Sequence, residues 1–205
     1  MRIVGIDPGS ERTGYGCVET DGRRHRLVTC GAITAAAGDA FPARLARIHR
    51  ELVALLAKTR PDCVAVESVF HAVNARSALK LGHARGVALL AAVEAGCTIV
   101  EYTPAEVKRA VVGYGRAEKR QVQHMIKLLL GLAQPPTPYD ASDALAVAIC
   151  HVHSGVFKAG LKQTGLKQAG LKTRLYEDDS VEASLRTRLK KLPKSWRHYR
   201  PPAHG

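Results

Sequence analysis

Two carboxylates stand at the ends of apolar runs in this sequence. Asp7 follows the run 3–6 and comes directly before the turn signal 8–10, and Glu67 closes the run 63–66. Such runs are typical of strands in the centre of a sheet, where an acid at the exit is either a turn former or a site residue. Because open α/β sheets place their sites at the carboxyl edge, we expect the two acids to converge if their strands are parallel neighbours.

A second pair of acids, Asp140 and Asp143, lies three residues apart and shares one face at the start of the last predicted helix. One interpretation is that Asp140 caps this helix and Asp143 complements its dipole. The helix is almost wholly apolar through Cys150 and is therefore expected to be buried, so its acidic first turn faces the inside of the fold.

Four neighbouring carboxylates predict divalent-metal chemistry. Each like-charged pair at about 4 Å costs roughly 4 kcal/mol at an effective dielectric constant of 20, so some acids take up protons or a cation lies between them. Hard oxygen ligands without paired His or Cys spacing select Mg²⁺, with Mn²⁺ as a substitute. Two such ions about 4 Å apart activate water and stabilise the leaving oxygen of a phosphodiester.

The hydrophobic pattern predicts the elements that position these acids. Residues 1–35 have the pattern of a β-meander, and further strands are predicted over 63–70 and 98–102. Helices are predicted from Pro42, from about Asn74 to Glu94, from the capping box at Thr103, over 119–130 and from near Asp140. Three antiparallel strands followed by alternating helices and strands predict an α/β fold, with a mixed sheet covered by helices on both faces.

Composition indicates a soluble, cytoplasmic protein that meets a polyanion. The 205 residues are 46% hydrophobic, contain five scattered cysteines and carry a net charge of +13. No segment has the length of a membrane span or the form of a secretory signal, and buried free thiols are favoured over disulfides or zinc. Such a basic chain is typical of nucleic-acid binding, although charge alone identifies no enzyme.

The basic charge is concentrated in the C-terminal part of the chain. From residue 156 onward there are 12 Lys and Arg against 4 Asp and Glu, so +8 lies in this part and 13 − 8 = +5 in the rest. A five-residue repeat beginning at Gly160, Gly165 and Gly170 fits neither a strand nor a helix period, which predicts weak order. We therefore predict a nuclease domain over 1–155 and a basic low-complexity extension over 156–205, which either binds nucleic acid or keeps the protein soluble.

Six ordered blocks of the sequence resemble the RuvC family of Holliday-junction resolvases, the crossover junction endodeoxyribonucleases of the ribonuclease-H-like superfamily. The resemblance spans about residues 1–153, and its blocks lie at 6–9, 67–70, 74–86, 112–119, 121–125 and 140–146. It implies a five-stranded ribonuclease-H-like sheet and a homodimer that cuts two opposed strands of a four-way DNA junction symmetrically. It also implies recombination and repair as the setting, and a complex with a branch-migration helicase.

The resemblance also implies roles for individual residues. Asp7, Glu67, Asp140 and Asp143 match the metal-binding catalytic acids, with two Mg²⁺ ions per active site. Phe70, which follows the strand, would stack on bases at the crossover, although an aromatic residue at a strand end is otherwise more often part of a core. The basic residues would contact phosphates, or they remain solvated surface charges. These predicted DNA contacts are Phe70, Arg76, Lys80, Lys108, Arg116, Lys119 and Arg120. Ser68 and His83 depart from the family pattern, where glutamine is expected.

The long helix offers a candidate dimer interface. Ala78, Gly82 and Gly86 recur every four residues and would let another backbone approach closely, which favours either a second copy of the chain or the protein's own sheet.

Three other functions remain open at this point. The opening Asp7-Pro8-Gly9-Ser10 also resembles the phosphate loop of actin-like ATPases, but their duplicated domain does not fit into 205 residues. A ribonuclease-H-like nuclease that acts on structured RNA is a second alternative. A non-catalytic junction-binding protein is a third, although it would not need four acids that repel DNA.

Overall fold

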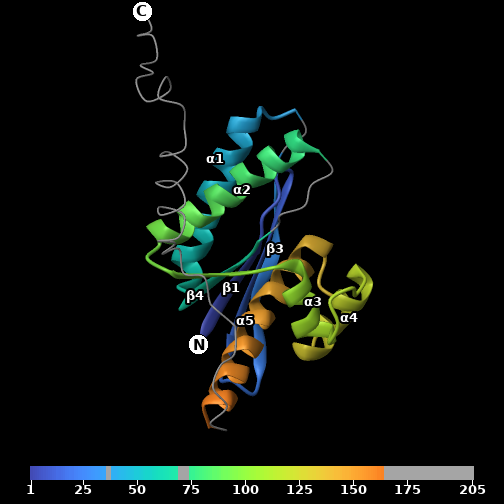
Figure 1. The fold of residues 1–205 in the computed structure, drawn as a ribbon. Coiled ribbons are helices and arrows are strands. Elements are labelled where there is room, and N and C mark those ends of the chain that lie inside the picture. Colours follow the sequence, from blue (N-terminus) through green and yellow to red (C-terminus); the bar gives the residue numbers. More distant parts are fainter. Residues whose placement is uncertain (36–37, 69–73, 164–205) are drawn as a thin grey trace, which may run out of the picture. The chain divides into compact units, whose positions relative to one another are not determined.

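The computed structural model describes residues 1–35, 38–68 and 74–163, and the side chains of the last helix as far as Ser154. Five strands form one sheet in the order β3-β2-β1-β4-β5 (Figure 1). The elements are β1 (Arg2–Asp7), β2 (Arg12–Thr20), β3 (His25–Thr34), α1 (Phe41–Thr59), β4 (Cys63–Glu67), α2 (Ala75–Glu94), β5 (Thr98–Tyr102), α3 (Pro104–Val112), α4 (Lys119–Leu129) and α5 (Tyr139–Gln163). β1 pairs antiparallel with β2 and parallel with β4, so the predicted mixed five-stranded sheet is confirmed.

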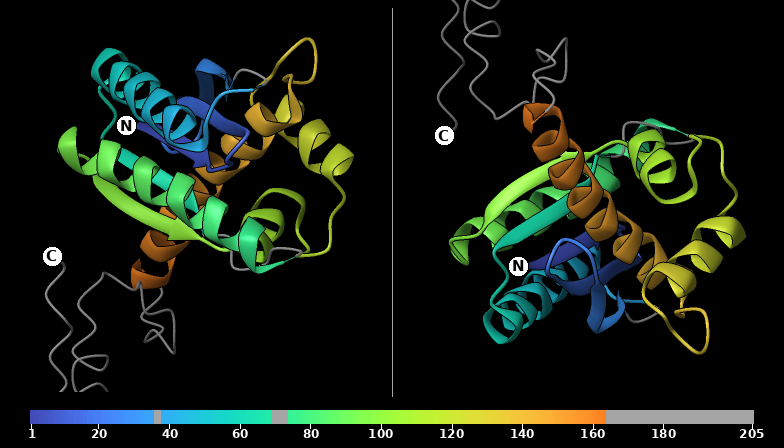
Figure 2. Two further views of the ribbon diagram at one scale, coloured as in Figure 1. Left: turned by 90° about the horizontal axis from the view of Figure 1, so that it is seen from above. Right: turned by 90° about the horizontal axis from the view of Figure 1, so that it is seen from below.

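Helices cover both faces of this sheet, each over its own hydrophobic core. Side chains alternate between the faces along each strand, so neighbours in sequence enter different cores. On one face, Val4, Val66, Leu52 and Ala88 belong to a core shared with α1 and α2. On the other face the core is shared with α3, α4 and α5 and includes Ile3, Val18, Ala65, Val107, Ile126 and Leu145. The views in Figure 2 show α1 and α2 on the opposite side of the strands from α5.

Glycines in β1 and β2 let the backbone of α5 lie directly on the sheet. A Cβ added at Gly5 would lie 2.0 Å from the carbonyl oxygen of Ala144, and one added at Gly14 would lie 2.0 Å from the carbonyl oxygen of Asp140. Real Cβ atoms do not approach backbone this closely, so side chains at these positions would displace the helix. The glycines therefore determine how close the acidic first turn of α5 comes to the strands.

The ends of the helices follow local sequence signals. The side chain of Asn74 accepts a hydrogen bond from the backbone N–H of Ser77 at the start of α2, and Thr103 and Glu106 form the predicted capping box of α3. α3 ends at Gly113, whose φ of 96° is left-handed and favours glycine.

Element boundaries differ from the prediction in two places. β4 ends at Glu67, so the predicted strand over 63–70 is too long, and residues 69–73 lie outside the described residues. α5 continues past the expected end of regular structure near 155 to Gln163. The predicted domain boundary therefore falls within a helix, while the division into 1–155 and 156–205 stays a prediction.

All five cysteines are free, as predicted, and three of them, Cys17, Cys63 and Cys150, are buried, whereas Cys30 and Cys97 are half-buried. Among the described helices, none is long and apolar enough to cross a membrane.

Candidate active site

Parallel pairing brings the first two acids together. β1 and β4 pair in register from Ile3 opposite Cys63 to Ile6 opposite Val66, so Asp7 and Glu67 are the next residues on adjacent strands. By strand alternation both side chains lie on the face of Ala65, which is the face covered by α5. The convergence expected from the sequence is therefore present in the fold.

α5 adds a third acid, and α4 adds a cation. Lys119, the first residue of α4, donates from Nζ to Oδ2 of Asp143 at 3.1 Å. Asp143 also acts electrostatically on both Asp7 and Glu67, which places its carboxylate beside them. Three acids from β1, β4 and α5 thus share one site with a lysine at its mouth.

The two strand acids share a proton in the absence of a metal ion. Burial raises the pKa of Asp7 to about 9, and the Glu67 and Asp143 carboxylates add to this rise. Burial also raises the pKa of Glu67, although the hydrogen bond that it accepts from Asp7 opposes the rise. Two buried carboxylates in contact cannot both ionise readily without a positive charge between them.

Asp140 lies at the edge of the same site. Its backbone rests against Gly14, which is the cross-strand partner of Asp7. The pKa of Lys119 is raised mainly by the negative charge of Asp143, and the charges of Asp7 and Asp140 add to this rise. Lys119 therefore lies in the field of acids from β1 and from both predicted positions on α5.

The donor set of this site suits a hard divalent cation. The converging ligand atoms are carboxylate oxygens, and a cation in place of the shared proton would allow Asp7 and Glu67 to ionise together. In the conformation described here, no three His, Cys, Asp or Glu side chains of residues 1–35, 38–68 and 74–163 form a ready metal-ligand group. Metal binding would therefore require side-chain movement at the acids, and a bound cation would compete with Lys119 for Asp143.

The predicted DNA contacts lie in three places. Lys119 pairs with Asp143, and Lys108 is close enough for its charge to act on Glu67. Arg116 and Arg120 are exposed near the start of α4, and Arg76 and Lys80 are exposed on the first turns of α2. Phe70 lies outside the described residues. Contact of these residues with DNA stays a prediction.

Comparison with known proteins agrees with this fold. The sequence model of the family described as "Crossover junction endodeoxyribonuclease RuvC" matches residues 3–151. The chain belongs to the RuvC family. RuvC of Geobacter sp. (strain M21) is 56% identical over 162 residues, covering 79% of this chain and 98% of the relative. RuvC of Koribacter versatilis is 54% identical over 155 residues, covering 75% and 93%.

A solved RuvC structure has the same fold. Thermus thermophilus RuvC in complex with Holliday junction substrate superposes with a TM-score of 0.73 at 36% identity, covering 77% of this chain and 96% of that one. The RuvC-family assignment confirms the ribonuclease-H-like fold and makes the chain a crossover junction endodeoxyribonuclease that resolves Holliday junctions. It decides against the ATPase, the RNA nuclease and the non-catalytic binder.

Several features that shape this RuvC-family site were not predicted from the sequence. The close approach of α5 needs Gly5 in β1 and Gly14 and Gly16 in β2. The sequence did carry a signal for this approach, because Gly14 and Gly16 lie two residues apart and glycine within a strand often marks a place where another backbone comes close. The pairing of Lys119 with Asp143 had no sequence signal, since the residues lie on different helices.

We expect the metal-free protein to lose stability as pH rises, through Asp7. Its folded pKa of about 9 exceeds the reference value of 3.8, so the folded state keeps a proton that the unfolded state releases. The stability that this proton supplies is complete below about pH 4 and is lost as pH rises through 9, by at most about 1.4 kcal/mol per pH unit. Thermal unfolding should show Mg²⁺ stabilising the protein strongly at pH 8.5 and weakly at pH 5.

The variant Asp7→Asn separates the pH dependence that comes from Asp7 from the pH dependence that comes from all other titrating groups. It lacks the titrating carboxyl group, so its unfolding temperature should depend less on pH and respond less to Mg²⁺. An equal Mg²⁺ effect at both pH values, or in both proteins, would contradict the interpretation.

Proposed function

We propose that this chain resolves four-way DNA junctions by metal-dependent hydrolysis, with Asp7, Glu67, Asp140 and Asp143 as the ligands of two Mg²⁺ ions. The observation that carries the proposal is the convergence of Asp7, Glu67 and Asp143 from three elements at the carboxyl edge of β1 and β4. Mn²⁺ would substitute, because it also accepts hard oxygen ligands.

The residues of the chain divide the work of phosphodiester hydrolysis. Bound divalent ions supply activation of water and stabilisation of the leaving oxygen. The acids hold those ions, and the fixed approach of α5 to β2 determines where Asp140 and Asp143 stand relative to the strands. Lys119 pairs with Asp143 and is placed to exchange this contact for one with the incoming phosphate, and the positive charge of Lys108, which acts on Glu67, would add to the attraction.

Cleavage of matched substrates tests this proposal. The protein is incubated with Mg²⁺, Ca²⁺ or EDTA and a mobile four-way junction, a linear duplex of the same sequence, or a structured RNA. We expect paired symmetric nicks in the junction alone, with Mg²⁺ and not with EDTA. Cutting in EDTA, or equal cutting of the duplex, would overturn the proposal.

A homodimer is part of the proposed function, because two equivalent sites suit a two-fold substrate. The outer face of α2 is available for it. A Cβ added at Gly82 or Gly86 would meet nothing within 4 Å, so these glycines do not serve packing among residues 1–35, 38–68 and 74–163. Leu79, Leu90 and Val93 are 65%, 50% and 64% exposed at helical spacing around them. A second copy of the chain would bury this apolar face.

We expect Gly82→Leu to yield a folded monomer. The single chain has room for the new side chain, so the monomer keeps its stability, whereas a close helix contact between two copies would be blocked. Sedimentation equilibrium should show dimer affinity reduced by at least about tenfold, and paired nicking should become independent nicking. The exposed Ala57→Leu on α1 is the matched control. An unchanged dimer constant in Gly82→Leu would refute this interface.

A further inference from the structure

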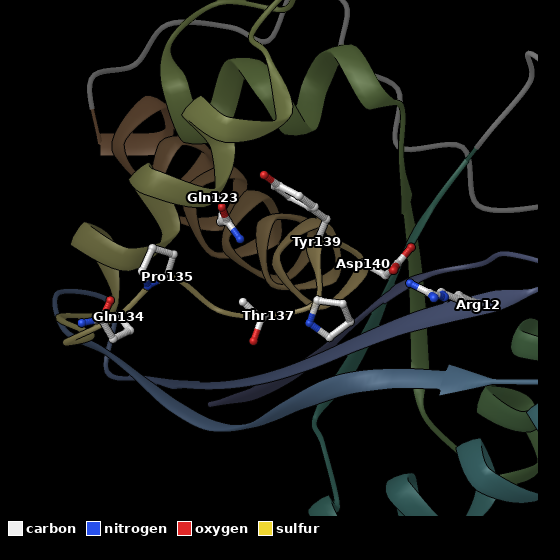
Figure 3. Close-up of a pocket in the computed structure, with 8 residues that line it drawn as sticks. Arg12, Gln123, Gln134, Pro135, Thr137, Tyr139 and Asp140 are labelled. Carbon is white, nitrogen blue, oxygen red and sulfur yellow. The ribbon is translucent and has the colours of Figure 1, made fainter.

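A cleft opens beside Asp140, outside the cluster of Asp7, Glu67 and Asp143. Its volume is ≈ 640 Å³, within the range of small-ligand sites. Its walls come from the start of β2, from α4 and from the connection that leads into α5. Figure 3 shows Arg12 and Asp140 at one end and Gln134 and Pro135 at the other. The polar lining residues are Arg12, Gln123, Gln134, Thr137, Tyr139 and Asp140.

The proline-rich wall of the cleft is held in place from two sides. The carbonyl oxygen of Pro136 accepts hydrogen bonds from Nε2 of Gln123 at 2.9 Å and from Oγ of Ser142 at 2.8 Å. Ser142 is only 1% exposed, so the second bond is buried. The carbonyl oxygen of Pro138 accepts from the backbone N–H of Ala141 at 3.0 Å. α4 and α5 thus fix the connection that forms this wall of the cleft.

The chemistry of the lining suits a nucleotide. Arg12 offers a guanidinium group for a phosphate, Gln134 offers an amide for a base edge, and Tyr139, 43% exposed, offers an aromatic ring for a base face. Phosphate contact, base-edge contact and stacking are the three ways in which proteins hold single nucleotides.

The location of the cleft indicates which nucleotide it would hold. Along the sheet edge, Glu67 of β4 and Asp7 of β1 are followed by Gly14 of β2, against which Asp140 rests. Arg12 lies two residues before Gly14 and therefore on the same face of the sheet. A DNA strand whose phosphate lies at the acids would reach the cleft on the β2 side.

We propose that this cleft is a subsite for the nucleotide next to the scissile phosphate, with Arg12 on its outer phosphate and Tyr139 and Gln134 on its base. This proposal rests on the proposed junction cleavage. It adds the nucleotide in the cleft to the junction structure as a feature that determines where the strand is cut. Base contacts here would make the cutting rate depend on the identity of that nucleotide.

A cycle of protein and DNA changes tests the role of Arg12. Neutral methylphosphonates replace single phosphates on either side of the cut, and single-turnover cleavage is measured for the wild type, Arg12→Gln and the control Arg23→Gln at the other end of the β2–β3 hairpin. One flanking methylphosphonate should slow the wild type and Arg23→Gln about tenfold. Arg12→Gln should be about tenfold slower on unmodified DNA and lose nothing more on that substrate. Strictly multiplicative losses at every position would overturn the proposal.

A binding measurement keeps the test independent of catalysis. Junctions carrying 2-aminopurine beside the cut site are titrated with Asp7→Asn protein, with and without the further change Tyr139→Ala. Stacking should quench the fluorescence at one position, and Tyr139→Ala should remove that quenching while the junction still binds. Quenching that is equal in the two proteins would refute the subsite. Absence of cleavage by the wild type would instead count against the proposed function and leave this result standing.

Discussion

Asp7→Asn is expected to lower the rate of junction cleavage by at least about 10³-fold while junction affinity stays within about threefold of the wild type. Asp7 is the acid that β1 presents to both Glu67 and Asp143, so its loss removes a ligand from the centre of the site. The amide keeps the size of the side chain and cannot ionise, so it adds no negative charge that would repel phosphate, and binding is not expected to weaken. Single-turnover kinetics and gel-shift titration measure the two effects separately.

The control for Asp7→Asn is Glu51→Gln, which also exchanges a carboxylate for an amide. Glu51 lies on the exposed surface of α1, where it pairs with Arg47, and α1 covers the face of the sheet opposite to α5 and the acids. Its cleavage rate should equal that of the wild type. If Asp7→Asn retains more than about a tenth of the wild-type rate, Asp7 is not a catalytic metal ligand.

Gly5→Val is expected to destabilise the protein by about 3–5 kcal/mol or to prevent folding. A Cβ at this position would lie 2.0 Å from the Ala144 carbonyl oxygen and 2.7 Å from the Ala148 backbone nitrogen. Both atoms belong to the backbone of α5, so relief requires moving the whole helix. Urea denaturation would measure the loss, and Gly5→Ala should already show most of it.

The control for Gly5 is Gly115→Ala. A Cβ at Gly115 would lie 3.5 Å from the Ala105 carbonyl oxygen, which is an ordinary contact. We expect its unfolding free energy to stay within about 0.5 kcal/mol of the wild type. Equal stabilities of Gly5→Ala and Gly115→Ala would show that α5 does not depend on the glycine contact.

The sequence predicted the sheet and its acids because their signals are local. The apolar runs before Asp7 and Glu67 define strands, and parallel pairing then fixes where both acids emerge. The capping box at Thr103 and the left-handed Gly113 likewise belong to short segments whose residues determine their own backbone. The order of the six family blocks pointed to the RuvC family, which no single motif was specific enough to do.

The remaining features depend on contacts between distant segments. The ion pair of Lys119 with Asp143 joins α4 to α5, and the cleft at Asp140 joins β2 to the connection before α5. The amphipathic patterns of these elements indicate that they pack, but many packings bury the same apolar area. The exposed glycines of α2 are a similar case, because spacing alone did not tell an outward face from an inward one.

Anomalous diffraction from crystals soaked in Mn²⁺ tests the central claim most directly. We expect two anomalous peaks about 4 Å apart, coordinated by oxygens of Asp7, Glu67, Asp140 and Asp143, with Lys119 moved away from Asp143. Crystals of Asp7→Asn should lose at least one peak. If the wild type shows no peak at these carboxylates at saturating Mn²⁺, with Lys119 still paired to Asp143, the four acids do not form a metal site.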